Sequence, residues 1–175
     1  MNASQIFFAH ANGFPARTYT KLFSFLEDEF EIGFIEKIGH DPNCPVTDGW
    51  TFLKDEIKNA IQKQNSAPVI GIGHSLGGIL HLLAAAENPE IYERIILLDA
   101  PVISRFRSHS LRVLKITKLI DRYSPAQMTI FRRTLWKTKE EAFEHFRKKQ
   151  KFAAFDDDVL RDYVEYGLIE TGKGF

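Results

Sequence analysis

Cysteine is almost absent from this chain, since Cys44 is its one cysteine among 175 residues. An intrachain disulfide is therefore impossible, and a reducing compartment is the simpler expectation. Residues 1–5 contain no basic segment leading into an apolar stretch, and no run approaches the roughly 20 apolar residues of a membrane-spanning helix. We predict a cytoplasmic protein and do not expect membrane association.

Cofactor signatures are also missing. No cluster of metal ligands, no phosphate-binding glycine loop and no cofactor fingerprint is visible, so neither a cofactor nor a metal is predicted. The 23 basic and 23 acidic residues cancel to a formal net charge of zero. We predict no nucleic-acid partner, and the sequence leaves the oligomeric state open.

Strand and helix patterns alternate in the first part of the chain. Strands are predicted at 6–9, 31–38, 69–72 and 94–98, and helices at 19–30, 50–64 and 79–86. Phe25 is among the apolar residues of the first helix that we expect to face the sheet, and Asp48 is expected to cap the second helix. Strands linked by helices imply a parallel sheet, so the predicted fold class is α/β, with helices flanking the sheet.

The most informative motif is Gly73-His74-Ser75-Leu76-Gly77, a G-x-S-x-G signature between a predicted strand and a predicted helix. This context is the nucleophile elbow of serine hydrolases, in which a sharp turn exposes the serine hydroxyl. Glycine at 73 and 77 lets strand and helix approach closely, and the helix N-terminus offers free N–H groups to a developing oxyanion. The alternative is a sharp turn in which Ser75 only caps the helix.

A second glycine-bearing turn, His10-Ala11-Asn12-Gly13-Phe14-Pro15, follows the first strand. Together with the Gly-His-Ser-Leu-Gly-Gly segment, it resembles the α/β-hydrolase superfamily, although Ala11 stands where glycine is usual. The resemblance implies a serine nucleophile at Ser75 and an oxyanion hole made by the N–H groups of Asn12 and Leu76. We expect the side chains of His10 and His74 to be structural.

Asp99 ends the strand that follows the nucleophile helix. Some members of the superfamily place the catalytic acid after this strand, so the resemblance makes Asp99 the candidate carboxylate for orienting a catalytic histidine. More members place that acid one strand later. The alternative is an aspartate that caps the turn before Pro101.

Beyond residue 103 the pattern becomes almost entirely helical. We predict a hydrolase core at 1–103 and a helical cap at 104–175, resembling the cap that such enzymes insert above the sheet. From Arg105 to Lys151 the sequence carries 14 Lys or Arg and 4 Asp or Glu. This excess could attract anionic substrates, an acidic partner or a membrane surface, but we favour a solvated face balanced by the acidic remainder.

The sequence does not identify the histidine that usually serves as general base. After Ser75 the histidines are His81, His109 and His145, and none lies in a late strand-to-loop setting. The resemblance covers nearly the whole chain but only about the first two thirds of the fold of the superfamily. A fragment, a shortened relative that has lost activity, and a site completed by a partner chain would each explain this, and we favour the fragment.

The leading hypothesis is a serine hydrolase that attacks a carboxylic ester or related acyl bond of a small molecule through Ser75. Without a histidine, such a site would be catalytically incomplete, because loss of one triad member costs on the order of 10⁴ to 10⁶ in turnover. The alternative is a non-catalytic ligand-binding or interaction module that keeps the elbow only as a turn.

Overall fold

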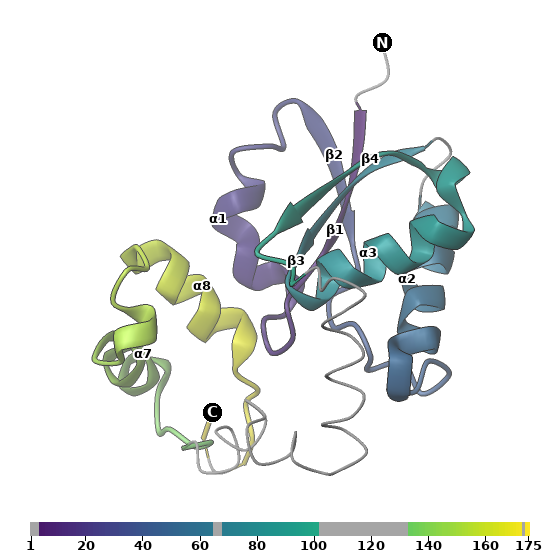
Figure 1. Ribbon diagram of the computed structural model, residues 1–175. Coiled ribbons are helices and arrows are strands. Elements are labelled where there is room, and N and C mark those ends of the chain that lie inside the picture. Colours follow the sequence, from purple (N-terminus) through teal and green to yellow (C-terminus); the bar gives the residue numbers. More distant parts are fainter. Residues whose placement is uncertain (1–3, 65–67, 102–132, 173) are drawn as a thin grey trace.

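The computed structural model describes residues 4–64, 68–101, 133–172 and 174–175. Among them, four parallel strands form the centre of the molecule (Figure 1): β1 (Ser4–Ala9), β2 (Phe30–Phe34), β3 (Val69–His74) and β4 (Tyr92–Leu98). The sheet order is β2-β1-β3-β4, and each neighbouring pair is parallel. This order confirms the predicted α/β fold class, a parallel sheet flanked by helices.

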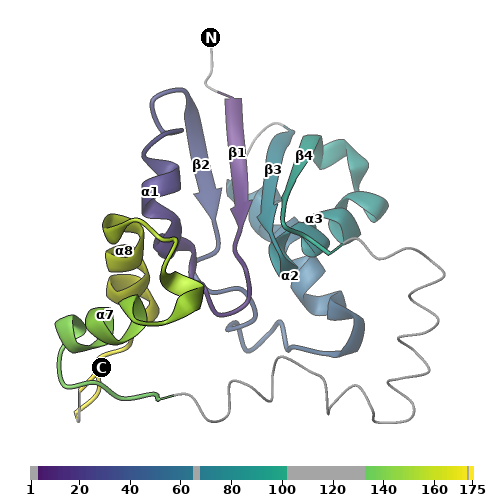
Figure 2. The same cartoon turned by 60° about the vertical axis from the view of Figure 1, so that its left-hand side comes forward.

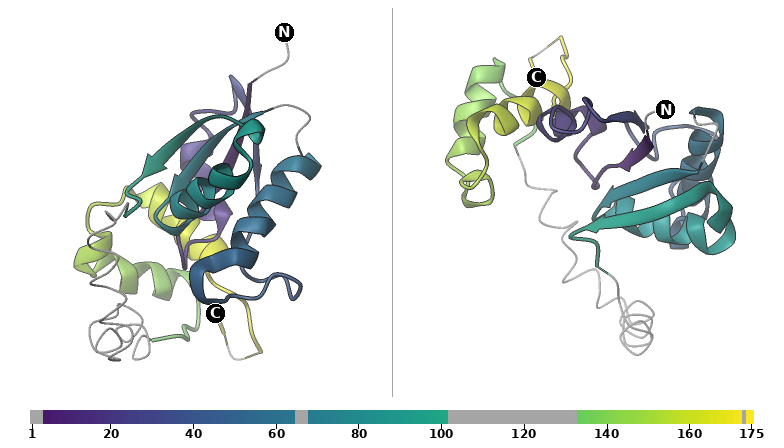
Figure 3. Two further views of the ribbon diagram at one scale, coloured as in Figure 1. Left: turned by 45° about the vertical axis from the view of Figure 1, so that its right-hand side comes forward. Right: turned by 90° about the horizontal axis from the view of Figure 1, so that it is seen from above.

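Helices cover both faces of the sheet (Figure 3). On one face lie α2 (Thr51–Gln64) and α3 (Leu76–Glu87), whereas α1 (Thr20–Phe23) lies on the other. The side chains of β1 alternate between the two faces, because successive strand residues point in opposite directions. Phe7 packs in the core on the α2 and α3 face, whereas Phe8 packs toward α1. Burying one such side chain contributes about 1.5 to 3 kcal/mol.

The segment between β1 and β2 differs from the prediction. The expected helix at 19–30 is a 3-10 turn, η1 (Ala16–Tyr19), followed by the short α1, and β2 ends at Phe34 instead of reaching Ile38. Phe25, predicted to face the sheet, is 72% exposed. Beyond Phe23 the chain continues as a series of turns to Glu29, with hydrogen bonds such as that from the Leu26 N–H to the Phe23 carbonyl at 2.8 Å.

The second helix begins one residue later than predicted. Asp48 lies inside a 3-10 turn, η2 (Asp48–Trp50), and α2 starts at Thr51. Gly49 and Trp50 have φ values of 78° and 55°, which an α-helix does not accommodate, so the helix cannot extend back to the expected Asp48 cap. The helical spacing of the apolar residues in α2 predicts one stripe of Phe52, Leu53, Ile57, Ala60 and Ile61. Leu53, Ile57 and Ile61 are buried, whereas Phe52 is 43% exposed.

The C-terminal residues form a helical unit beside α1 (Figure 2). It contains α7 (Lys139–Arg147), a 3-10 turn η4 (Gln150–Phe152) and α8 (Asp157–Gly167). Helix α8 packs against η1 and α1. The Lys21 ammonium lies 2.6 Å from the Asp158 carboxylate, and the Lys21 backbone N–H donates to Asp162 at 3.1 Å.

Much of the predicted cap lies outside the described residues, including the predicted boundary between residues 103 and 104. The division into core and cap, and the placement of the cap above the sheet, stay predictions. Most of the excess of Lys and Arg between residues 105 and 151 also lies outside the described residues. Within the described part, Arg133 pairs with Glu141, Lys139 with Glu165 and Arg147 with Asp157.

Strand β4 lies at one edge of the sheet and, within the described part of the chain, pairs only with β3. Two of its apolar side chains face solvent, with Ile96 42% and Leu97 36% exposed. Charged Glu93 and Arg94 precede them on the same strand. The edge therefore combines unpaired backbone groups with apolar surface.

Candidate functional site

Ser75 occupies the turn between β3 and α3. Its φ of 51° and ψ of −113° are outside the conformations that L-residues usually adopt. The turn is held from two sides, because the Ser75 N–H donates to the Leu98 carbonyl at 2.9 Å and the Ser75 carbonyl accepts from the Ile79 N–H at 3.3 Å. A strained serine between a strand and a helix is the local geometry expected of a nucleophile elbow.

Glycine is required on both sides of Ser75 because backbones approach closely there. A Cβ at Gly73 would lie 2.4 Å from the Gly78 nitrogen, and a Cβ at Gly77 would lie 2.0 Å from the Ala9 carbonyl oxygen. Neither position can hold a larger residue without a backbone shift. The start of α3 is thus pressed against the end of β1.

The loop after β1 contains the turn Ala11 to Phe14, closed by a 3.1 Å hydrogen bond from the Phe14 N–H to the Ala11 carbonyl. Gly13 has a φ of 78°, as the third position of a type II turn requires. Asn12 is exposed, and no hydrogen bond of its N–H to another described residue is found. This N–H is therefore available to a ligand.

The sheet register brings this loop close to the elbow. Ala9, the last residue of β1, pairs with Gly73 near the end of β3. Asn12 is three residues beyond Ala9 of β1, and Ser75 is two residues beyond Gly73 of β3. Both residues therefore follow the same end of two paired strands. Leu76 is the first residue of α3, and the first N–H groups of a helix have no acceptor within it. The assignment of Asn12 and Leu76 as oxyanion donors stays a prediction.

Two histidines that precede Ser75 in the sequence, His10 and His74, are bonded to other groups. Both ring nitrogens of His10 meet the backbone, with Nδ1 donating to the Ala11 carbonyl and Nε2 accepting from the Ile38 N–H, each at 2.8 Å. The His10 pKa is lowered by burial, which favours this neutral form. Nδ1 of His74 lies 2.7 Å from the Tyr19 hydroxyl. The expectation that both histidines are structural agrees with these contacts.

The histidines after Ser75 are also placed away from it where they are described. His81 is fully buried beside Tyr92, with 2.9 Å between Nδ1 and the tyrosine hydroxyl, and burial lowers its pKa to about 4. His145 lies in α7 against Trp136. His109 is outside the described residues. Among the described histidines, none forms a hydrogen bond with Ser75.

Asp99 follows β4 with a φ of 46°, directly after the Leu98 carbonyl that accepts from Ser75. The residue is exposed. The histidine that feels its charge is His74: burial lowers the His74 pKa, and the Asp99 carboxylate opposes that shift. Asp99 is therefore close to the elbow, and its role as catalytic acid stays a prediction.

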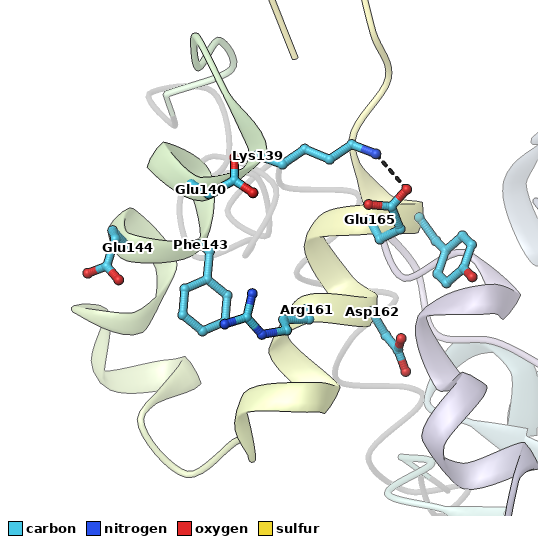
Figure 4. A pocket seen from close by; sticks show the side chains of 8 residues that line it. Lys139, Glu140, Phe143, Glu144, Arg161, Asp162 and Glu165 are labelled. Carbon is cyan, nitrogen blue, oxygen red and sulfur yellow. Dashed lines mark hydrogen bonds and ion pairs between the residues drawn. The ribbon is translucent and has the colours of Figure 1, made fainter.

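Two surface hollows lie elsewhere. One, of about 340 Å³, lies between α7 and α8, and Figure 4 shows the side chains that line it. The Lys139 ammonium lies 2.6 Å from the Glu165 carboxylate, and the Arg161 guanidinium lies 4.7 Å from the centre of the Phe143 ring. The other, of about 430 Å³, is lined by residues that include Cys44 and Glu56. Ser75 lines neither of these hollows.

Comparison with protein families shows which family this chain belongs to. The model of the alpha/beta hydrolase family matches residues 6–168. The chain belongs to the alpha/beta hydrolase family. In the family context, the elbow, the sheet order and the loop after β1 are parts of one fold.

Relatives extend well beyond the length of this chain. Monoglyceride lipase of Rattus norvegicus is 29% identical over 124 residues, which cover 66% of this chain and 41% of the rat protein. An abhydrolase domain-containing protein of Alternaria alternata is 30% identical over 101 residues, or 58% of this chain and 34% of the fungal protein. The chain thus spans less than half the length of these relatives.

Solved structures share the fold at lower sequence identity. An E-2-(acetamidomethylene)succinate hydrolase superposes with a TM-score of 0.72 at 20% identity, covering 98% of this chain and 59% of that one. A hydrolase structure from Rickettsia typhi gives a TM-score of 0.69 at 18% identity and covers 99% of this chain and 58% of that one. Similarity at this level supports the fold alone.

The described residues contain neither a candidate membrane span nor a cluster of metal ligands. None of their helices has both the length and the apolar composition needed to cross a bilayer. No group of three or more His, Cys, Asp or Glu side chains in this part of the chain is arranged to hold a metal ion.

The sequence analysis did not identify Tyr19 as a residue near the elbow. Its hydroxyl is hydrogen-bonded to His74, 55 residues away in the sequence, and no local pattern indicates this contact.

Proposed function

We propose that this chain carries the nucleophile side of a serine hydrolase site, with the Ser75 Oγ attacking a carboxylic ester or related acyl bond of a small molecule. The observation that carries the proposal is the strained Ser75 backbone between β3 and α3, at φ 51° and ψ −113°. Strain of about 1 to 3 kcal/mol persists only where the surroundings impose it, and it concentrates at functional sites. Here Gly73, Gly77 and the Leu98 carbonyl impose it.

In the proposed reaction, the Ser75 oxygen forms a bond to the acyl carbon and the carbonyl oxygen becomes an oxyanion. The N–H groups of Asn12 and Leu76 would donate to that oxyanion, and the positive end of the α3 dipole would add to its stabilisation. The serine proton passes to water or hydroxide of the solvent, because no described histidine is hydrogen-bonded to Ser75, and acylation is therefore slow. The choice of an acyl substrate is supported by the rat relative, whose name is that of a lipase acting on monoglycerides.

We further propose that Ser75 lacks an effective general base in this 175-residue form. The rings of His10, His74 and His81 are bonded to groups other than Ser75, which supports this view. The expected result is acylation without efficient turnover. The competing proposal, a non-catalytic binding module, predicts no covalent chemistry at Ser75.

A fluorophosphonate probe followed by peptide mapping tests the proposal. The wild-type chain should form an adduct on Ser75, Ser75→Ala should lose it, and Ser24→Ala should keep it, since Ser24 is an exposed serine directly after α1. Hydrolysis of a p-nitrophenyl ester, measured in parallel, reports turnover. Equal labelling of wild type and Ser75→Ala would refute the enzyme proposal, and efficient turnover would refute the absence of a base.

A further inference from the structure

The Tyr19 hydroxyl lies between the loop after β1 and the elbow. It accepts a hydrogen bond from the Ala11 backbone N–H at 3.2 Å and lies 2.7 Å from Nδ1 of His74. The Tyr19 ring is fixed from behind, because it packs against the Phe8 ring in the core at a centroid distance of 4.7 Å. The hydroxyl is therefore held in place and bonds both segments at once.

The direction of these hydrogen bonds follows from the number of protons. Burial raises the Tyr19 pKa to about 12, so the hydroxyl keeps its proton at neutral pH. The Ala11 N–H can only donate, so the tyrosine oxygen accepts from it. Donation from the hydroxyl to Nδ1 of His74 is the arrangement that also gives the hydroxyl proton an acceptor among these groups, and we infer this direction. His74 then carries its proton on Nε2. Burial lowers the His74 pKa, which keeps this ring neutral and able to accept.

The two ends of this hydrogen-bonded chain lie next to the proposed reactive groups. Ala11 precedes Asn12, whose N–H is one proposed oxyanion donor, and His74 precedes Ser75. Behind them, the Ala9 carbonyl lies against Gly77. Catalysis by oxyanion donors depends on distances held to a few tenths of an ångström, so a bond that spans loop and elbow affects both.

We propose that Tyr19 is a positioning residue that fixes the oxyanion loop against the nucleophile elbow through its hydrogen bonds to Ala11 and His74. The proposal rests on the proposed function of Ser75. It assigns Tyr19 no contact with the substrate.

The test compares two tyrosine-to-phenylalanine variants. Tyr19→Phe removes one oxygen and leaves the ring packed on Phe8. Tyr92→Phe is the matched control, since its hydroxyl also bonds a histidine, His81, but in the core behind the sheet. Both variants lose a partly buried Tyr–His hydrogen bond, and only the first loses the link between loop and elbow.

The kinetic readout is the fluorophosphonate reaction of Ser75, separated into its maximal rate constant and its concentration for half-maximal rate. We expect Tyr19→Phe to lower the maximal rate constant about 10- to 100-fold, as misplacement near 1 Å does, with little change in the half-maximal concentration. Tyr92→Phe should react within about twofold of wild type, because its loss leaves loop and elbow in place. Equal rates for Tyr19→Phe and wild type, or equal losses in both variants, would overturn the proposal.

A second readout does not depend on reactivity. In ¹⁵N NMR spectra, His74 of the wild-type chain should show an unprotonated Nδ1 and a protonated Nε2, and Tyr19→Phe should abolish this preference while Tyr92→Phe leaves it. A protonated Nδ1 in the wild type would overturn the hydrogen-bonded chain. If Ser75 of the wild type fails to react, the proposed function falls, and the role of Tyr19 in catalysis falls with it, whereas the NMR result still decides whether the bond to His74 exists.

Discussion

Substitution of Gly77 by alanine should destabilise the protein because the contact behind it is backbone. The added Cβ would lie 2.0 Å from the Ala9 carbonyl oxygen, whereas ordinary contact begins at 3.4 Å, so about 1.4 Å of displacement is needed. A carbonyl group in β1 cannot rotate away without breaking the sheet. Overpacking of this kind costs about 3 kcal/mol or more, and the better helix propensity of alanine returns at most about 1 kcal/mol.

The net loss is therefore about 2 kcal/mol, which for a chain of this length lowers Tm by roughly 4 to 8 °C in a thermal melt followed by circular dichroism. Gly167→Ala is the matched control. Gly167 is also helical, but the nearest atoms to a Cβ there are 3.9 Å away. That variant should melt at or slightly above the wild-type temperature. If Gly77→Ala melts as high as Gly167→Ala, the close approach of α3 to β1 is wrong.

Two further outcomes are expected. Ser75→Gly should raise the free energy of unfolding by about 1 kcal/mol in urea titrations, since glycine adopts a φ of 51° without strain. Ser75→Ala is the control, because alanine keeps the backbone strain. An equal gain in the free energy of unfolding for both variants would contradict this prediction. Stability should also fall as pH drops from about 6.5 to about 4: folded His81 has its pKa lowered to about 4 by burial, so in this window the unfolded chain binds the proton and the folded one does not. The shift corresponds to about 3 kcal/mol, and His81→Phe should flatten the urea midpoint over this range, whereas an unchanged slope would show that His81 is not buried in its neutral form.

The elbow could be predicted from the sequence because its physical requirement is local. Gly73 and Gly77 mark the close approach of strand and helix directly in the residue pattern, and the apolar run before Ser75 marks the strand. The α/β class follows in the same way from alternating periodicities. In contrast, apolar periodicity extended the predicted helix to residue 30 and placed Phe25 toward the sheet, whereas α1 ends at Phe23 and turns follow it.

Contacts between distant segments were beyond sequence reasoning. Nothing near Tyr19 indicates that its hydroxyl meets His74, since the pairing depends on which strands are neighbours and how η1 returns to the sheet. The docking of α8 on α1 through Lys21 and Asp158 is of the same kind. Such contacts combine ordinary residues whose local patterns predict only helix or turn.

The open edge of β4 has a practical consequence for every measurement described above. Among the described residues β4 pairs with β3 alone, and a strand edge left unpaired beside exposed Ile96 and Leu97 can recruit a strand from another molecule. Such pairing rises with concentration and would slow probe access or sharpen melting for reasons unrelated to Ser75. Rates and melting temperatures therefore need to be compared across a dilution series. The Ile96→Lys substitution should suppress this association, because a charged side chain on an edge strand disfavours pairing with another molecule.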